Sequence, residues 1–277
     1  MTDSAWADEL AFATNLARRA GRVLRDSYER VERIDYKSAR DVVTDVDYRS
    51  EAMLLEAIRE AYPGDAILAE ESGAHKRIGY DGTAARRRWV LDPLDGTVNY
   101  ANGIPFFCVS IALVADGHPV MGVILDPMRD DLYTATADGP TLLDGEPVAA
   151  SEKEALSDYV VSLTVIGRGG IGRERRIARR IRIPRRMGSA ALALAYVANG
   201  RFDACVQNGG ISPWDVAAAG LIAERAGATV SDISGGPWWD DTKTGPNVSI
   251  VAAPPPHHGE LLALLAAEGA TLQTRRP

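Results

Sequence analysis

The sequence predicts an α+β protein of the mixed α/β kind, built as one unit over residues 1–277 from two subdomains that share a cleft. Two patterns predict this class. Residues 1–150 read as two helices followed by a run of short strands, whereas strands and helices alternate in residues 151–277. A chain of 277 residues with 46% hydrophobic content can bury a sizeable core, and no Pro- or Ser-rich linker divides the halves.

Two helices open the first half. Between residues 5 and 30 apolar side chains recur at three- and four-residue steps, which is the stripe of an amphipathic helix. A second helix should follow Asp47 and end at Pro63-Gly64. Strands of an antiparallel-type sheet are then expected, separated by Gly, Pro and Asp turns, over residues 66–70, 88–92, 106–115, 120–126 and 131–137.

The second half alternates between strands and helices, which predicts a sheet covered by helices. The expected strands are residues 159–166, 181–183, 202–207, 228–233 and 248–253. The expected helices are a basic segment after the first of these strands and residues 189–198, 214–227 and 258–268.

Composition excludes several classes of protein. The net charge of −7 argues against general affinity for nucleic acid or anionic membranes. No stretch reaches the roughly 18 consecutive apolar residues of a membrane span, and the N-terminus lacks a secretory pattern, so we expect a cytoplasmic protein. Cys108 and Cys205 lie in apolar runs and are expected to be small buried hydrophobes.

The stretch Asp92-Pro-Leu-Asp95 predicts a pair of converging carboxylates. Pro93 interrupts the strand before it and Gly96 permits a sharp turn, so both acids can point to one place outside the strand end. Like charges at that distance repel unless a cation neutralises them, and hard oxygen ligands suit Mg²⁺ or Mn²⁺. The alternative is a simple Asx-turn.

Further acids stand at the ends of predicted elements. Glu70 and Glu71 end a short strand, and Asp215 begins a helix, positions that can face a common crevice in an α/β sheet. Asp215 can also be read as an ordinary acid favoured by the helix dipole. The cluster DVVTDVD, residues 41–47, precedes the second helix, where capping by Thr44 or Asp45 is the alternative; it is a poor match to a calcium loop.

In order and spacing, DVVTDVD, AEES, WVLDPLDGTVNYANGIPFF, GSAALALAYVANGRFDA and PWDVAAAGLIAERAGATVSD resemble the inositol monophosphatase family of lithium-sensitive, Mg²⁺-dependent sugar phosphatases. The resemblance runs from about residue 8 to residue 265. It implies a layered αβαβα sandwich, a homodimer, and hydrolysis of a small polyol or sugar phosphate, with inositol 1-phosphate as the first candidate. It also implies two to three Mg²⁺ ions, for which Mn²⁺ can substitute.

The resemblance assigns the metal ligands. Glu70, Asp92 and the carbonyl of Leu94 would hold one ion, while Asp92, Asp95 and Asp215 would hold a second. A third, looser ion would touch Glu70. Two more residues match positions close to the ions, Lys37 and Glu71.

The same resemblance assigns the reaction and the substrate contacts. Thr97 would orient the attacking water, with Glu70 as its base and Asp47 behind Thr97, and the N–H groups of Gly96 and Thr97 would bind phosphate. Substrate contacts beside Asp95 and Asp215 would come from Gly188, Ser189, Ala190 and Asn208. Packing alone also explains the small residues, and Asn208 stands where many inositol phosphatases have a glutamate.

An arginine-rich stretch, residues 173–186, contains eight arginines in a protein of negative net charge. A solvated helix face explains it simply. The functional hypothesis is that Arg185 or Arg186 contacts a second phosphate, as in fructose 1,6-bisphosphate. The preceding GRGGIG, residues 167–172, fits a dinucleotide-binding pattern formally but lacks the ribose-binding acid about 20 residues on.

Other functions remain open at this point. Within the family these are fructose-1,6-bisphosphatase, histidinol-phosphate phosphatase and nucleotide 3′-phosphatase. A different class is a non-catalytic partner of RNA or of the transcription machinery, because some bacterial members act in that way. Intact Asp95 and Asp215 would be needed by the enzyme and not by such a partner.

Overall fold

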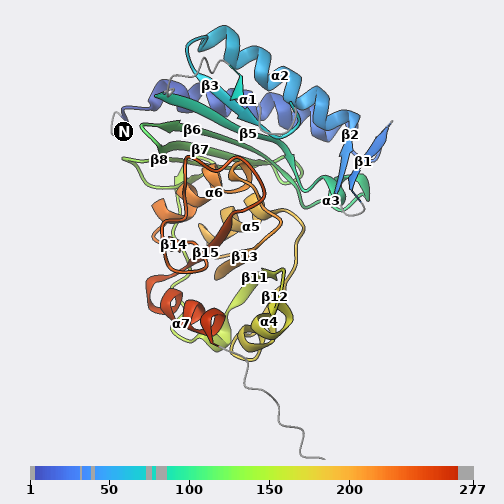
Figure 1. Cartoon of the computed structure of the whole chain (residues 1–277). Coiled ribbons are helices and arrows are strands. Elements are labelled where there is room, and N and C mark those ends of the chain that lie inside the picture. The colour runs from blue at the N-terminus through green and yellow to red at the C-terminus, as the bar shows by residue number, and fades with distance from the viewer. Residues whose placement is uncertain (1–3, 32, 39–40, 73–76, 79–85, 268–277) are drawn as a thin grey trace, which may run out of the picture.

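The computed structural model describes residues 4–31, 33–38, 41–72, 77–78 and 86–267. Helices and sheets alternate in five layers, so the predicted αβαβα sandwich is confirmed (Figure 1). An outer pair of helices covers a large sheet, two central helices separate this sheet from a smaller one, and a last pair of helices covers the far side. No described helix is long and apolar enough to cross a membrane.

The first layer consists of α1 (Ala7–Ser27) and α2 (Asp45–Ala61), which pack on each other and on the large sheet. Helix α1 buries the predicted apolar stripe. Helix α2 begins three residues before the predicted start, because Thr44 caps it and Asp47 completes a capping box as the third helical residue. A short hairpin that the sequence did not reveal, β1 (Ile34–Ser38) and β2 (Asp41–Thr44), leads into α2.

The large sheet has the strand order β10-β9-β8-β7-β6-β5-β3-β4 and is antiparallel apart from the β3·β5 pair. Its strands are β3 (Ala66–Ala69), β4 (Arg77–Ile78), β5 (Arg87–Asp95), β6 (Cys108–Ala115), β7 (His118–Asp126), β8 (Asp131–Thr136), β9 (Leu142–Leu143) and β10 (Glu146–Pro147). The prediction that Pro93 stops the strand is corrected here: β5 runs through it to Asp95, with a shift of register between Asp92 and Asp95. A bulge is a position at which a strand tolerates proline.

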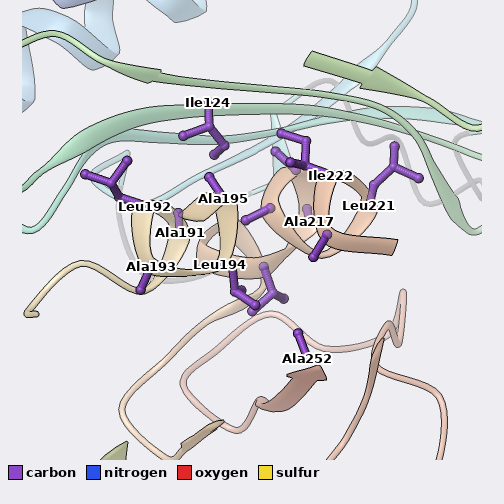
Figure 2. Close-up of a cluster of buried hydrophobic side chains, with 14 of the residues drawn as sticks. Ile124, Ala191, Leu192, Ala193, Leu194, Ala195, Ala217, Leu221, Ile222 and Ala252 are labelled. Carbon is purple, nitrogen blue, oxygen red and sulfur yellow. The ribbon is translucent and has the colours of Figure 1, made fainter. Parts of the chain in front are cut away.

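The central layer consists of α5 (Ala190–Val197) and α6 (Pro213–Arg225). Apart from the two ends of α6, both helices are apolar on every side, since they are sandwiched between the two sheets. Figure 2 shows Ile124 of the large sheet above α5 and Ala252 of the smaller sheet below it. The many alanines of both helices allow close packing, which fixes the ends of α5 and α6 relative to β5.

The smaller sheet has the order β12-β11-β13-β15-β14, and all its strands lie after residue 150. Its strands are β11 (Val160–Val165), β12 (Ile183–Arg185), β13 (Ala204–Asn208), β14 (Thr229–Ser231) and β15 (Ser249–Ala253). Helices α4 (Gly170–Ala178) and α7 (Pro255–Ala266) cover its outer side. Strand β12 lies two residues later than predicted, and α7 begins three residues earlier.

Candidate active site

The irregular end of β5 brings the first two acids together, where the register shifts between Asp92 and Asp95. Leu94 donates its N–H to Oδ1 of Asp92 at 3.0 Å, so the Asx-turn considered from the sequence is present. Gly96 follows with φ of 101° and begins the short helix α3 (Thr97–Ala101). A Cβ on Gly96 would lie 3.2 Å from the Cβ of Ser189, so both the backbone conformation and the space favour glycine.

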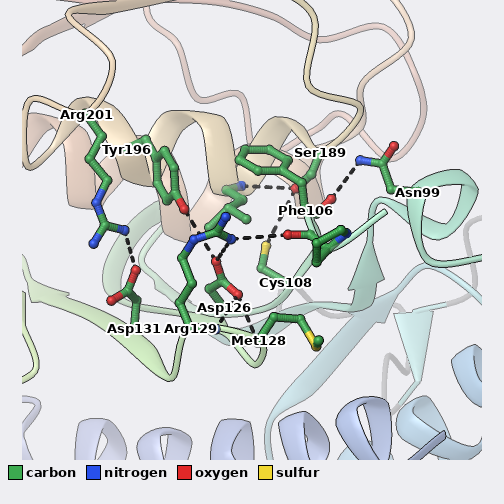
Figure 3. Close-up of polar contacts among 12 residues, drawn as sticks. Asn99, Phe106, Cys108, Asp126, Met128, Arg129, Asp131, Ser189, Tyr196 and Arg201 are labelled. Carbon is green, nitrogen blue, oxygen red and sulfur yellow. Dashed lines mark hydrogen bonds and ion pairs between the residues drawn. The ribbon is translucent and has the colours of Figure 1, made fainter. Parts of the chain in front are cut away.

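Asp95 is held by the start of α5. Its Oδ2 accepts hydrogen bonds from Ser189 Oγ at 2.5 Å and from the Ala191 N–H at 2.7 Å. The thiol of Cys108 lies 3.9 Å from the same oxygen and from Ser189 Oγ (Figure 3). Cys108 is free and buried, as predicted, but its place beside a site acid was not foreseen. These contacts join an acid of the first half to a helix of the second.

Asp215 lies in the first turn of α6. The N–H of Ser212 donates to its Oδ2 at 2.5 Å, which completes a capping box, so Asp215 is indeed a helix-start acid. Capping the helix uses only Oδ2 of Asp215. The other role considered from the sequence, a metal ligand, is compatible with it.

Asp92, Asp95 and Asp215 form one cluster, in which one oxygen from each carboxylate lies within 4.8 Å of the others. All three side chains are at most 9% exposed. Burial is the main cause of raised pKa values: those of Asp92 and Asp215 lie well above the usual range, and that of Asp95 rises to about 6. The charge of Glu70, just beyond β3, raises all three further.

The residues present fit a divalent cation. Oδ2 of Asp92 is buried, and no described residue donates a hydrogen bond to it. In Asp95 and Asp215, the hydrogen bonds given above are all accepted by Oδ2. A buried oxygen cluster with too few donors is unfavourable unless a cation or protons neutralise it. Oxygen-only ligands match Mg²⁺ and Mn²⁺ better than softer metals.

Thr97 and Asp47 form a second polar group beside the cluster. Thr97 Oγ1 lies 2.9 Å from Oδ1 of Asp47 and 3.0 Å from the Leu94 carbonyl, and it can donate to either. Oδ2 of Asp47 accepts the Thr44 N–H at 2.9 Å, so capping uses one oxygen and Thr97 the other. Burial raises the pKa of Asp47 to about 6, and the charge of Glu70 adds to the shift.

The loop between α3 and β6 is held in place by Asn99 and Arg129, which the sequence did not single out. Asn99 Nδ2 donates to the carbonyls of Phe106 and Met187, each at 2.7 Å, and Arg129 donates to the Pro105 carbonyl at 3.2 Å (Figure 3). Gly188, with φ of 79°, would place a Cβ 2.8 Å from Asn99 Oδ1. Asn99 therefore fixes the segment that leads into α5.

A cavity of about 330 Å³ opens beside Asp95 and Asp215, within the range of roughly 300–1,000 Å³ for small-molecule sites. The predicted residues Gly188, Ser189 and Ala190 line it. The remaining lining residues are Ser162, Thr164, Arg186, Met187, Gln207, Gly210 and Ile211.

Several predicted site residues lie elsewhere. Gln207 lines the cavity, but its neighbour Asn208 does not. Arg186 lines both the cavity and an adjacent groove, whereas Arg185 borders the groove alone. The N–H of Glu71 donates to Glu51 Oε2 at 2.6 Å. The backbone of Lys37 belongs to β1, but its side chain lies outside the described part of the chain.

The strand β11 carries a signal that would have revealed two of the missed residues. Val161, Leu163 and Val165 face the core under the smaller sheet, so the alternate residues Ser162 and Thr164 face the other way, toward the cavity. Two hydroxyl side chains on one face of an otherwise apolar, covered strand indicate contact with water or a ligand.

The chain matches the inositol monophosphatase family over residues 6–270. It is 38% identical over 243 residues to a Salmonella typhimurium LT2 protein named Nus factor SuhB, covering 82% of this chain and 86% of that one. It is also 38% identical over 228 residues to the inositol-1-monophosphatase of Mesorhizobium japonicum, covering 79% and 84% of the two chains.

Solved structures agree with this match. The Thermotoga maritima IMPase superposes with a TM-score of 0.82 at 31% identity, covering 93% of this chain and 96% of that one. The inositol monophosphatase from Anabaena gives a TM-score of 0.79 at 33% identity, with 95% and 96% coverage. Fold, acidic cluster and sequence thus agree: the chain belongs to the inositol monophosphatase family.

Proposed function

We propose that the protein is a Mg²⁺-dependent phosphomonoesterase that hydrolyses a small polyol or sugar phosphate. The main support for the proposal is that carboxylate oxygens of Asp92, Asp95 and Asp215 lie within 4.8 Å of one another, beside a cavity of small-molecule size. Inositol 1-phosphate is the first substrate to test, because a relative named inositol-1-monophosphatase is 38% identical.

The size of the rate acceleration explains why several acids that can hold cations are needed. Enzymes accelerate phosphate-monoester hydrolysis by up to about 10²¹-fold, which is a barrier reduction of about 29 kcal/mol. One general base supplies only about 10²- to 10⁴-fold. When bound, two or three Mg²⁺ ions would supply the charge that stabilises the phosphoryl oxygens. Asp92, Asp95 and Asp215, together with Glu70 and the Leu94 carbonyl, would hold them.

The residues around the ions would place the reactants. Thr97, held by its 2.9 Å hydrogen bond to Asp47, would orient the attacking water, and Glu70 would accept its proton. The N–H groups of Gly96 and Thr97 would bind the phosphate. The hydroxyls of the substrate would reach Asp95, Asp215 and the start of α5.

Amide substitution of two cluster acids tests the proposal. Asp95→Asn and Asp215→Asn should each lower phosphate release by at least about 10³-fold, because the cluster loses a charge that holds the cation. Release should be measured with Mg²⁺ over inositol 1-phosphate, fructose 1,6-bisphosphate, histidinol phosphate, glycerol 2-phosphate and 3′-phosphoadenosine 5′-phosphate. Retention of most of the activity by either variant would contradict the proposal.

Asp116→Asn is the matched control. This acid lies between β6 and β7 with its side chain 82% exposed, and asparagine tolerates its φ of 47°. Its activity should equal that of the wild type. Both site variants should also stay folded, since burial raises the pKa of both carboxyls and so disfavours their charged form when no cation is bound.

A second candidate function, docking on the transcription machinery, is favoured by the relatives named Nus factor SuhB. Arg175 of α4 and Arg179, directly after α4, are exposed and form no ion pair with another described residue, so they offer positive charge to a partner. Titration of purified bacterial RNA polymerase separates the two candidates. A docking protein should keep its affinity in Asp95→Asn and lose it in the Arg175→Glu/Arg179→Glu double variant.

A further inference from the structure

A second cavity lies between the C-terminal part of α1 and the end of β7, where the chain turns toward β8. Its volume is about 150 Å³, and we call it the α1 pocket. Its lining residues are Arg18, Gly21, Arg22, Arg25, Leu125, Pro127 and Asp130. It shares no lining residue with the cavity beside Asp95 and Asp215, so a ligand bound in it would occupy a separate site.

The α1 pocket is tight at its base and small. A Cβ on Gly21 would lie 2.5 Å from Cδ2 of Leu125, so glycine is what allows α1 to pack directly on the end of β7. The volume is below the range of roughly 300–1,000 Å³ that is typical of sites for whole small molecules. The space therefore suits a single small group better than a complete sugar or nucleotide.

The lining of the α1 pocket is strongly cationic. Arg18, Arg22 and Arg25 are four and three residues apart along α1, so they are neighbours on one face of the helix. Asp130 is the one acid among the described lining residues, which leaves an excess of two positive charges in a protein whose net charge is −7. Like charges at this spacing repel and destabilise a helix, and an anion in the pocket would relieve that repulsion.

These arginines are available to a ligand. Arg18 pairs with Asp130 at 3.2 Å, but the two side chains are 40% and 67% exposed, so exchanging this partner costs little. Arg22 and Arg25 are exposed and form no ion pair with another described residue.

A solvated helix end is the simpler explanation of such a cluster. The carbonyl end of a helix attracts cations, but this effect falls off within the last turn. It accounts for Arg25, which lies in the last turn of α1, and not for Arg18 and Arg22 further back. The helix dipole therefore does not explain the cluster as a whole.

We propose that the α1 pocket is an anion site that binds a phosphate group, either as free inorganic phosphate or as the phosphate of an ester whose remainder stays in solvent. Guanidinium groups bind phosphate oxygens through paired donors, and three of them around one small space offer more donors than a single phosphate needs. Leu125 and Pro127 supply an apolar wall beside the charges. Less water at that wall strengthens the attraction between arginine and anion.

Isothermal titration calorimetry in excess EDTA tests the proposal. Without a divalent cation the acidic cluster of Asp92, Asp95 and Asp215 repels phosphate, so binding reports on the α1 pocket. Inorganic phosphate and glycerol 2-phosphate are the two ligands, each titrated at low and at high ionic strength. The wild type should bind inorganic phosphate saturably, and the affinity should fall as salt screens the arginines.

Two charge-removing variants should weaken this binding. Arg22→Gln and Arg25→Gln should each raise the Kd for phosphate by about tenfold, because a charge-assisted hydrogen bond is lost. Arg19→Gln is the matched control, since Arg19 is an exposed arginine of the same helix that does not line the pocket. Its Kd should stay within about twofold of the wild type, because a charge outside the pocket is screened.

Asp130→Asn tests the proposal in the opposite direction. Asparagine tolerates the φ of 58° at this position, but it no longer competes with the ligand for Arg18 as an anion. The Kd for phosphate should fall by about threefold, as expected for loss of an exposed competing charge. An unchanged or higher Kd would contradict the role given to Asp130.

The two ligands distinguish the sources of the phosphate group. Similar Kd values for both identify a phosphate carried on a larger molecule, whereas binding of inorganic phosphate alone identifies the free ion. No saturable binding by the wild type, or equal effects of Arg19→Gln and Arg22→Gln, would overturn the proposal. All four variants change exposed side chains, so their Tm without phosphate should match that of the wild type. Because neither Mg²⁺ nor turnover enters the measurement, its result is independent of the proposed phosphatase function.

Discussion

The acidic cluster of Asp92, Asp95 and Asp215, called the floor below, differs in burial from the cavity-lining side chains of Arg186 and Gln207, called the rim. On the floor Asp92, Asp95 and Asp215 are at most 9% exposed, and backbone or side-chain donors orient each of them. At the rim the Arg186 side chain is 66% exposed and pairs with Glu174 of α4. Burial makes the floor rigid and sensitive to any change of charge, whereas the rim can change its residues at little cost to the fold. Reaction chemistry is therefore expected to depend on the floor, and substrate choice on the rim.

The largest effect in this comparison should come from Thr97, at the edge of the floor. Thr97→Val removes the hydroxyl that contacts Asp47 at 2.9 Å and should lower kcat by about 10²- to 10⁴-fold, because the water loses its orienting group. Thr97→Ser keeps the hydroxyl and should recover activity to within about tenfold of the wild type. If valine and serine behaved alike in steady-state assays, Thr97 would have no part in the reaction.

Metal binding should stabilise the floor in a pH-dependent way. Without a cation, the folded protein raises the pKa of Asp95 from 3.8 to about 6, so its contribution to stability is present at low pH and is lost as pH rises through that range. The rise in Tm caused by Mg²⁺, measured against EDTA, should thus be larger at pH 7.5 than at pH 5. Equal shifts at both pH values, or a full shift in Asp95→Asn, would contradict the assignment of the cation to this cluster.

The smallest effect should come from the rim residue Gln207. Gln207→Ala should raise KM for inositol 1-phosphate by up to about tenfold with kcat nearly unchanged, since only a neutral hydrogen bond to a hydroxyl is lost. Asn208→Ala, one residue on and outside the cavity lining, should leave both constants near those of the wild type. The reverse result would return the substrate contact to Asn208.

The floor could be predicted from sequence because each acid stands at a strong local signal. Asp92 and Asp95 surround a proline beside a glycine, and Asp215 follows a helix-starting proline. The Asx-turn and the helix-start acid that were considered as alternatives are both present, and neither excludes a metal ligand, because a carboxylate has two oxygens. In Asp215 the hydrogen bond that caps the helix reaches Oδ2, and the cluster distance needs only one oxygen from each acid.

The rim could not be predicted because it depends on which face of a strand a residue occupies. Cys205 faces the central layer and Val206 faces the opposite core, so alternation turns Gln207 toward the cavity and Asn208 away from it. Counting residues back from Asp215 identifies Asn208 as the candidate position, but it does not tell which face of the strand that residue occupies. The sequence similarly left open which of Arg185 and Arg186 lies closer to the site; Arg186 lines the cavity and the adjacent groove, whereas Arg185 lines the groove alone.

The most direct test of the account is the anomalous signal of Mn²⁺ in crystals soaked with that ion. A peak coordinated by carboxylate oxygens of Asp92, Asp95 and Asp215 is predicted, and it should disappear in Asp215→Asn crystals soaked in the same way. A wild-type map without a peak among these three carboxylates, at a Mn²⁺ concentration that supports phosphate release, would contradict the claim that they hold the catalytic metal.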